Sequence, residues 1–171
     1  FIEWGFNTPL KSLISFSMNK QNFYDLNFDQ LKNFLIDKAE IDYNKAKMRA
    51  QQMFNAVYKK NIKNFDELTT FGLELREKIK NLISLEKPKI IDIQKSKDGT
   101  IKFLLELKDK RNVETVLIPD KSQSRYTICL SVSVGCYLSC EFCATAQISK
   151  KLVRNLTPGE IISQIILSKD Y

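Results

Sequence analysis

The sequence of 171 residues lacks histidine altogether and contains only five glycines and four prolines. Without histidine, any metal site must use other donors, and the four cysteines are the softest ones present. The chain also lacks an apolar run of the roughly 18 residues that a membrane-spanning helix needs. We therefore expect no membrane partner.

The charge is unbalanced toward basic residues. Lysine and arginine number 27 against 20 aspartates and glutamates, which gives a net charge of +7. A basic surface attracts polyanions, of which nucleic acid is the commonest. Lysines on solvated helix faces explain the same excess, so composition leaves both readings open.

The first half of the chain has helical periodicity. Asn27 with Gln30 matches a capping box, which predicts a helix beginning at residue 28. Further helices are expected over residues 46–60 and 70–85, with methionine and aromatic side chains in the core. These helices predict a small bundle over residues 18–86.

A period of two residues replaces the helical pattern in the next segment, 87–122. Asp98 and Gly99 lie between two apolar stretches and predict a tight hairpin turn. A third strand is expected over residues 112–118, ended by Pro119.

The last segment predicts a strand, a loop and a helix in that order. Residues 126–134 are expected to form a buried strand, and Thr157, Pro158 and Glu160 mark a capped helix start. Strand, loop and helix form the first half of a βαβ unit, so we expect the partner strand beyond Tyr171 and interpret the chain as the N-terminal piece of a longer protein. The predicted buried stripe of this helix consists of Ile161, Ile162, Ile165 and Ile166.

Three cysteines gather in the stretch VGCYLSCEFCATAQ. Cys136, Cys140 and Cys143 have the spacing C-x3-C-x2-C, whereas a disulfide framework distributes its cysteines along the chain. Three thiolates can bind three irons of a 4Fe–4S cluster and leave the fourth iron open, unlike electron-transfer clusters with four cysteine ligands. Cys129 could instead close a four-thiolate zinc site, and buried inert thiols are a third reading.

The cysteine stretch resembles the radical S-adenosylmethionine (SAM) superfamily, whose hallmark is C-x3-C-x-aromatic-C. Cys136, Cys140, Phe142 and Cys143 match it. The resemblance implies an α/β fold with a partial (β/α) barrel, and SAM bound to the open iron with Phe142 near its adenine. Reductive cleavage of SAM would supply a radical that abstracts hydrogen.

The flanking stretches DGTIKFLLEL, VETVLIP and LVRNLTPGEIISQI are similar to those of the RlmN/Cfr family. This resemblance implies methylation of C2 of an adenosine in 23S ribosomal RNA, and of adenosine 37 in some tRNAs, through a methyl-cysteine intermediate. Glu114 matches the family's proton-accepting glutamate. Cys129 matches the thiol that forms a transient disulfide with the methyl-carrying cysteine, which this chain lacks.

The same resemblance implies an organisation and partners. Residues 18–86 correspond to an RNA-binding accessory domain, 87–122 to a β-hairpin segment, and 123–171 to the start of a truncated barrel. A flavodoxin-like one-electron reductant, a monomeric state and a cytoplasmic location are expected. The chain alone should be inactive, because the glycine-rich SAM-binding strand lies outside it.

Several features leave alternatives open. Arg154 could contact RNA phosphate or cap a helix, and Lys59, Lys60 and Lys63 could face RNA or solvent. The stretch ATAQISKKLV is slightly longer than the family pattern. The alternative functions are a four-cysteine zinc module that binds RNA, a C8-methylating enzyme of the resistance type, or another radical SAM enzyme such as a maturase.

Residues 1–17 show no clean periodicity, and Met18 opens a stretch with the character of a natural start. We expect residues 1–17 to be either upstream read-through that is absent from the native protein or a poorly ordered extension. N-terminal mass spectrometry of the native protein should find Met18 first, and an intact Phe1 would contradict this.

Overall fold

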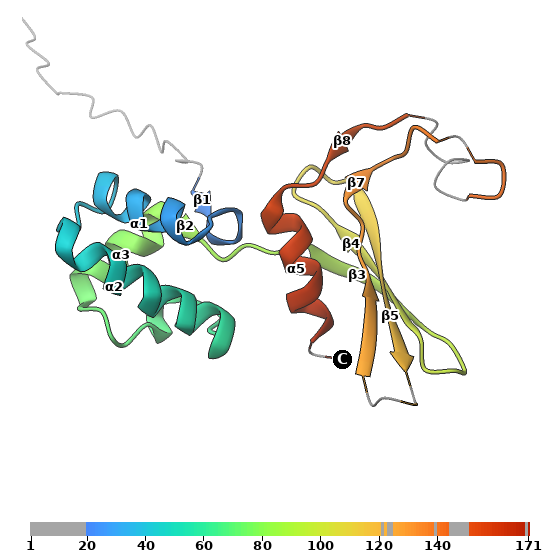
Figure 1. Ribbon diagram of the computed structural model, residues 1–171, viewed down its shortest axis with the longest axis horizontal. Helices are drawn as coiled ribbons and strands as arrows, with labels where there is room; N and C mark the ends of the chain where they lie inside the picture. The colour runs from blue at the N-terminus through green and yellow to red at the C-terminus, as the bar shows by residue number, and fades with distance from the viewer. Residues whose placement is uncertain (1–19, 121, 123–124, 139, 144–150, 170) are drawn as a thin grey trace, which may run out of the picture.

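The computed structural model describes residues 20–120, 122, 125–138, 140–143, 151–169 and 171. A helical unit and an antiparallel sheet lie on either side of one helix, α5 (Figure 1). The predicted extension, 1–17, lies outside the described residues. No helix in the described part of the chain has both the length and the apolar character that crossing a membrane requires.

The first helix, α1 (Phe28–Asp37), begins where the sequence predicts. The Asn27 side chain accepts a hydrogen bond from the Gln30 backbone N–H at 2.9 Å, and the Gln30 side chain accepts one from the Asn27 N–H at 2.9 Å. This reciprocal pair satisfies two amide groups that a helix start otherwise leaves without partners. The capping box is therefore confirmed.

The next two helices differ from prediction at their ends. α2 (Tyr43–Phe54) begins three residues early because Asp42 caps it, and it continues as a π-helical turn, η2 (Asn55–Lys59). α3 (Leu73–Leu82) starts after Gly72 and ends before the predicted residue 85. It ends there because the chain becomes extended in β2 (Ile83–Ser84).

The N-terminal segment of the helical unit forms part of that unit's hydrophobic core. β1 (Gln21–Asn22) pairs in parallel with β2, and η1 (Phe23–Asp25) follows it. η3 (Phe65–Glu67) lies between η2 and α3. As predicted, methionine and aromatic side chains lie in this core, together with aliphatic ones. The largest fully buried side chains of the core are Phe23, Phe71, Leu31, Leu35, Met53, Ile79 and Ile83.

The sheet has the order β3-β4-β5-β6, with antiparallel pairing throughout. The strands are β3 (Lys89–Lys95), β4 (Ile101–Glu106), β5 (Asn112–Asp120) and β6 (Arg125–Cys129). The hairpin turn predicted at Gly99 is confirmed, and this glycine has a φ of +95°, which favours a residue without a Cβ. In contrast to prediction, Pro119 does not end its strand but pairs with Tyr126.

The prediction of one buried strand over residues 126–134 is wrong. β6 is exposed at four of its five positions, because it is the edge strand of the sheet. The chain then leaves the sheet and forms a separate short pair, β7 (Ser133–Val134) with β8 (Arg154–Asn155). A mixed α/β fold is confirmed, whereas the parallel barrel stays a prediction.

The last helix, α5 (Pro158–Ser168), has the predicted start. Thr157 Oγ1 accepts from the Glu160 N–H at 3.2 Å, and the Glu160 carboxylate accepts from the Thr157 N–H at 2.9 Å. The predicted buried isoleucine stripe is wrong in detail, since these isoleucines are only half-buried. The most buried positions of α5 are Gly159, Ser163, Gln164 and Ser168.

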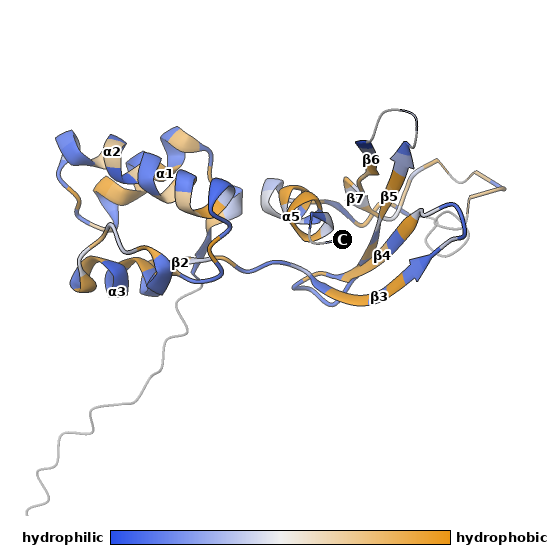
Figure 2. Ribbon diagram, turned by 90° about the horizontal axis from the view of Figure 1, so that it is seen from below, coloured by the Kyte–Doolittle hydropathy of each residue, from blue (hydrophilic) through white to orange (hydrophobic). Residues whose placement is uncertain are grey.

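α5 packs against two hydrophobic cores, which explains why its isoleucines are only half-buried. Ile162 and Ile166 pack against the core of the helical unit, whereas Ile161 and Leu167 pack against that of the sheet. Both views show α5 between the two parts (Figures 1 and 2). A helix packed on two sides has little room where its neighbours come closest, which suits Gly159, Ser163 and Ser168. The larger Gln164 is buried there because its amide has hydrogen-bond partners.

The closest approach is between α5 and η1. The Gly159 N–H donates to Asp25 Oδ1 at 2.7 Å, so a carboxylate of the helical unit satisfies an amide at the N-terminus of α5. A Cβ at Gly159 would lie 2.6 Å from this oxygen and 3.1 Å from the Asp25 backbone nitrogen. The contact therefore requires glycine.

We expect Gly159→Ser to lower the free energy of unfolding by about 1–3 kcal/mol, because the added atoms force η1 and α5 apart. Gly72→Ser is the matched control, since a Cβ there meets nothing within 4 Å and serine is a favoured helix cap. Urea unfolding followed by circular dichroism measures both. Equal stability of the two variants would contradict the close contact.

Candidate active site

Glu114 and Cys129 lie on the same face of the sheet. In β5 the residues Val113, Thr115 and Leu117 are buried, so Glu114 points to the opposite face. Cys129 is paired with Val116, which shares the face of Glu114. The structure thus places two residues that the sequence resemblance singled out for chemistry on one face of the sheet, the face turned away from α5.

Glu114 has a charged neighbour on the adjacent strand. Lys102 Nζ lies 3.1 Å from Glu114 Oε1, and the two side chains are 39% and 54% exposed. Lys102 belongs to β4 and, like Glu114, points away from the buried Phe103 side of the sheet. The carboxylate is therefore held by a cation and still accessible.

A buried glutamine fixes the backbone around these two residues. Gln164 Oε1 accepts from Thr115 Oγ1 at 2.8 Å and from the Ser131 N–H at 2.9 Å. Its Nε2 donates to the carbonyls of Ser131 at 2.9 Å and Glu160 at 3.3 Å. Ser131 Oγ in turn donates to the Glu114 carbonyl at 2.7 Å. The side chain is fully buried, and both of its polar atoms have two partners.

Gln164 was missed by the analysis of the sequence. The available signal was an amide within the apolar run IISQII, at a position where a helix buries its side chains. A buried amide needs partners, so its presence there indicates a hydrogen-bonding network. The sequence alone does not say which strands supply that network.

The cysteine loop leaves the fold through β7 and returns through β8. The Val153 N–H donates to the Val134 carbonyl at 2.8 Å, and the Leu156 N–H to the Val132 carbonyl at 2.9 Å. Gly135, directly after β7, has a φ of +77°, a conformation that suits glycine. The base of the loop is thereby closed, and part of the longer stretch ATAQISKKLV, residues 144–150, lies outside the described residues.

Cys136, Cys140 and Cys143 are free thiols and partly exposed. The Leu138 N–H donates to Cys136 Sγ at 3.4 Å, and the Cys143 N–H donates to the Cys140 carbonyl at 3.0 Å. In the parts of the chain that the structure describes, no three cysteine, aspartate or glutamate side chains converge as a metal site. Phe142 is 92% exposed.

The donor chemistry at this loop fits an iron–sulfur cluster. Thiolates are soft ligands suited to such clusters, and hydrogen bonds to the sulfurs, such as that from the Leu138 N–H to Cys136 Sγ, tune the clusters that they hold. Cys129 is exposed and lies on the same sheet face as Glu114. It is separate in sequence from the loop that contains the other three cysteines. The chain therefore offers one loop of three thiols, and a fourth thiol on the same sheet face as a carboxylate.

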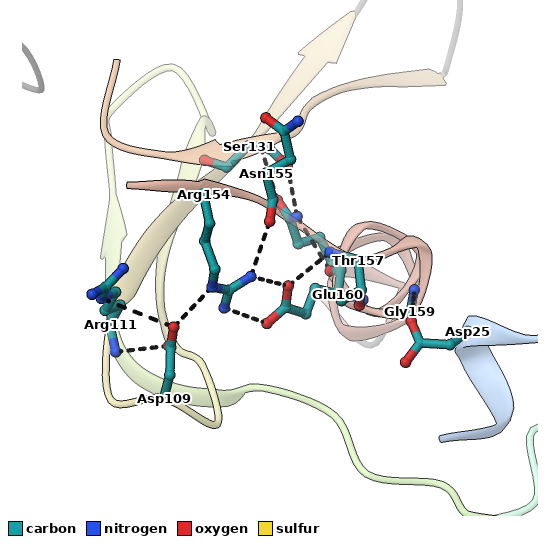
Figure 3. A network of polar contacts seen from close by, with 10 residues as sticks. Asp25, Asp109, Arg111, Ser131, Arg154, Asn155, Thr157, Gly159 and Glu160 are labelled. Atoms are coloured by element: carbon teal, nitrogen blue, oxygen red, sulfur yellow. Dashed lines mark hydrogen bonds and ion pairs between the residues drawn. The ribbon is translucent and has the colours of Figure 1, made fainter. Parts of the chain in front are cut away.

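Arg154 lies at the base of the cysteine loop and connects it to α5. Its guanidinium donates two bonds of 2.8 Å to the Glu160 carboxylate and one of 2.8 Å to Asp109 Oδ2 (Figure 3). The Arg154 hydrogen bond holds the pKa of Asp109 below its usual range. With two carboxylates bound, the Arg154 guanidinium lies at the start of α5, which agrees with the predicted alternative of a role at the helix start.

The fold matches a solved enzyme. The crystal structure of a radical SAM methyltransferase from Sphaerobacter thermophilus superposes with a TM-score of 0.73 and 31% identity, over 86% of this chain and 41% of that one. Architecture and thiol loop therefore resemble the class of radical SAM methyltransferases.

The particular family follows from the sequence relatives. Residues 21–85 match the family model of the ribosomal RNA large subunit methyltransferase N-terminal domain. The dual-specificity RNA methyltransferase RlmN of Campylobacter fetus is 39% identical over 87% of this chain, and that of Nitratiruptor is 38% identical over 82%. The chain spans 42% of the length of each of these relatives. The predicted resemblance to the RlmN family is confirmed.

We expect Gln164→Met to lower the free energy of unfolding by about 2–4 kcal/mol, because Thr115 and Ser131 lose buried hydrogen-bond partners. Gln94→Met is the control, since Gln94 is exposed and its side chain donates to the exposed side chain of nearby Asp92. Denaturant unfolding measures stability, and amide exchange at Ser131 should accelerate in the Gln164 variant alone. Unchanged exchange there would contradict the role of this amide.

Proposed function

We propose that this chain contributes the RNA-binding and cluster-binding part of an RlmN-type radical SAM methyltransferase. The reaction is methylation of C2 of an adenosine in 23S ribosomal RNA, and of adenosine 37 in some tRNAs, through a methyl-cysteine intermediate. The observation that carries the proposal is the shared sheet face of Glu114 and Cys129, in a chain whose fold and sequence resemble that class.

Cys136, Cys140 and Cys143 would hold a 4Fe–4S cluster through their thiolates, and Phe142 would contact SAM. When bound, this cofactor pair supplies the radical that activates an otherwise unreactive methyl group. Hydrogen bonds across β7 and β8 hold both ends of the loop, and the Arg154 network anchors β8 to α5. The chain thereby presents its three thiols from a fixed base.

Glu114 and Cys129 would act on the covalent adduct between protein and RNA. The Glu114 carboxylate would accept the proton from C2 of the adenine. The Cys129 thiol would then attack the sulfur of the methyl-carrying cysteine. An S–S bond forms as the bond from that sulfur to the methylene carbon breaks, and the methylene carbon keeps the electron pair and takes up a proton to become the methyl group. Both groups are exposed on one face, so a bound base can reach them together. A carboxylate positioned by hydrogen-bond or ion-pair partners is suited to general-base catalysis.

RNA recognition is assigned to the helical unit, residues 18–86. Lys59 and Lys60 at the end of η2 are exposed, and the net charge of +7 favours a polyanionic partner. Residues 87–122 would connect this unit to the start of the barrel at 123–171. A flavodoxin-like electron donor, a cytoplasmic location and a monomeric state complete the proposal.

Anaerobic reconstitution of the full-length protein containing this sequence tests the proposal. With iron and sulfide we expect a brown protein with about four irons, and loss of the cluster in Cys140→Ala but not in Cys129→Ala. Because Cys129 is the remaining cysteine of the chain, this pair of variants is matched. A colourless protein with one zinc bound by all four thiols would replace the enzyme with a zinc-stabilised RNA-binding module.

The substrate is tested by mapping adenosine methylation in a strain that lacks the gene. We expect the C2 methyl group to disappear from 23S ribosomal RNA and from tRNA, and to return on complementation. Loss of a C8 methyl group would identify the resistance-type reaction, and unchanged RNA would contradict both.

A further inference from the structure

Lys102 is the cationic partner of the proposed base. The register pairs Leu104 with Glu114 and Lys102 with Val116, which places Lys102 diagonally across from Glu114 on the same face. Its ammonium group reaches back to Glu114 Oε1 at 3.1 Å. Other charged groups that the register places on this face have partners of their own. Glu106 pairs with Lys110 at 2.9 Å, Asp120 pairs with Arg125 at 3.3 Å, and Asp92 accepts a hydrogen bond from Gln94.

The ion pair with Lys102 also affects the orientation of the Glu114 side chain. Lys102 contacts Oε1 from β4, and this contact holds one oxygen of the carboxylate toward that strand. A free glutamate side chain samples several rotamers, and proton transfer requires one of them. A cross-strand ion pair restricts that choice without burying the carboxylate.

We propose that Lys102 is a positioning residue for the proton transfer at Glu114, an inference that rests on the proposed function. Lys102 binds Oε1, and Oε2 accepts the proton from C2 of the adenine in the covalent adduct. In this step the C2–H bond breaks, an O–H bond forms on Glu114, and the electron pair of the C–H bond stays with the base. Lys102 itself neither donates nor accepts a proton.

The competing interpretation is an ordinary surface ion pair. Both side chains are substantially exposed, and such pairs contribute little to stability. Lys110 and Glu106 form a comparable pair at 2.9 Å in the same hairpin, without a predicted catalytic partner. The two interpretations differ in the step that a substitution slows, because a positioning residue affects resolution of the adduct and not its formation.

Single-turnover assays on the full-length, cluster-loaded protein separate them. Adduct is measured as the protein–RNA band on a denaturing gel, and product as methylated adenosine. Lys102→Met should form the adduct at the normal rate and resolve it about 10-fold more slowly or worse, because the base is misplaced. Lys102→Arg should restore resolution to within about 3-fold, since arginine keeps the charge and the reach.

Lys110→Met is the matched control and should resolve the adduct within about 2-fold of the normal rate. Lys102→Gln replaces Lys102→Met if circular dichroism shows that the methionine variant is misfolded. Normal resolution in the Lys102 variant, or an equal defect in the Lys110 variant, overturns the inference. Failure of the proposed function is distinguishable, because Glu114→Gln would then resolve the adduct normally, or no adduct or methyl product would form at all.

Discussion

The candidate site depends on one buried amide. Gln164 receives hydrogen bonds from Thr115 and Ser131 and donates to two backbone carbonyls, so both polar atoms of its side chain are fully used. Thr115 is adjacent to Glu114, and Ser131 is two residues from Cys129. A partly satisfied network of this kind would be strongly unfavourable in the interior, which is why it specifies one arrangement of strand and helix.

The second constraint is that α5 packs against two cores, that of the helical unit and that of the sheet. Its isoleucines and leucine contact two cores at once, while Arg154 joins its first turn to the loop that contains Asp109. The position of the thiol loop therefore depends on both the sheet and the helical unit. The helical unit and the sheet therefore pack against one helix in common.

Local features were predictable from the sequence, and long-range ones were not. The capping boxes at Asn27 and Thr157 depend on residues three positions apart, so they could be recognised directly. Gln164 bonds to Ser131 and Thr115, which are 33 and 49 residues away, and no periodicity contains that information. The β-branched stretch at 126–134 suits a buried or an edge strand equally, and only the pairing with β5 decides between them. The site residues came from motif resemblance, but their common face follows from the register between β5 and β6.

The contact between Asp25 and Gly159 links distant parts of the chain through groups that must match. A carboxylate on one side occupies the space that any side chain on the other would need. Recombination between homologues could therefore exchange the helical unit only together with the start of α5, or between parents that both retain this aspartate and this glycine.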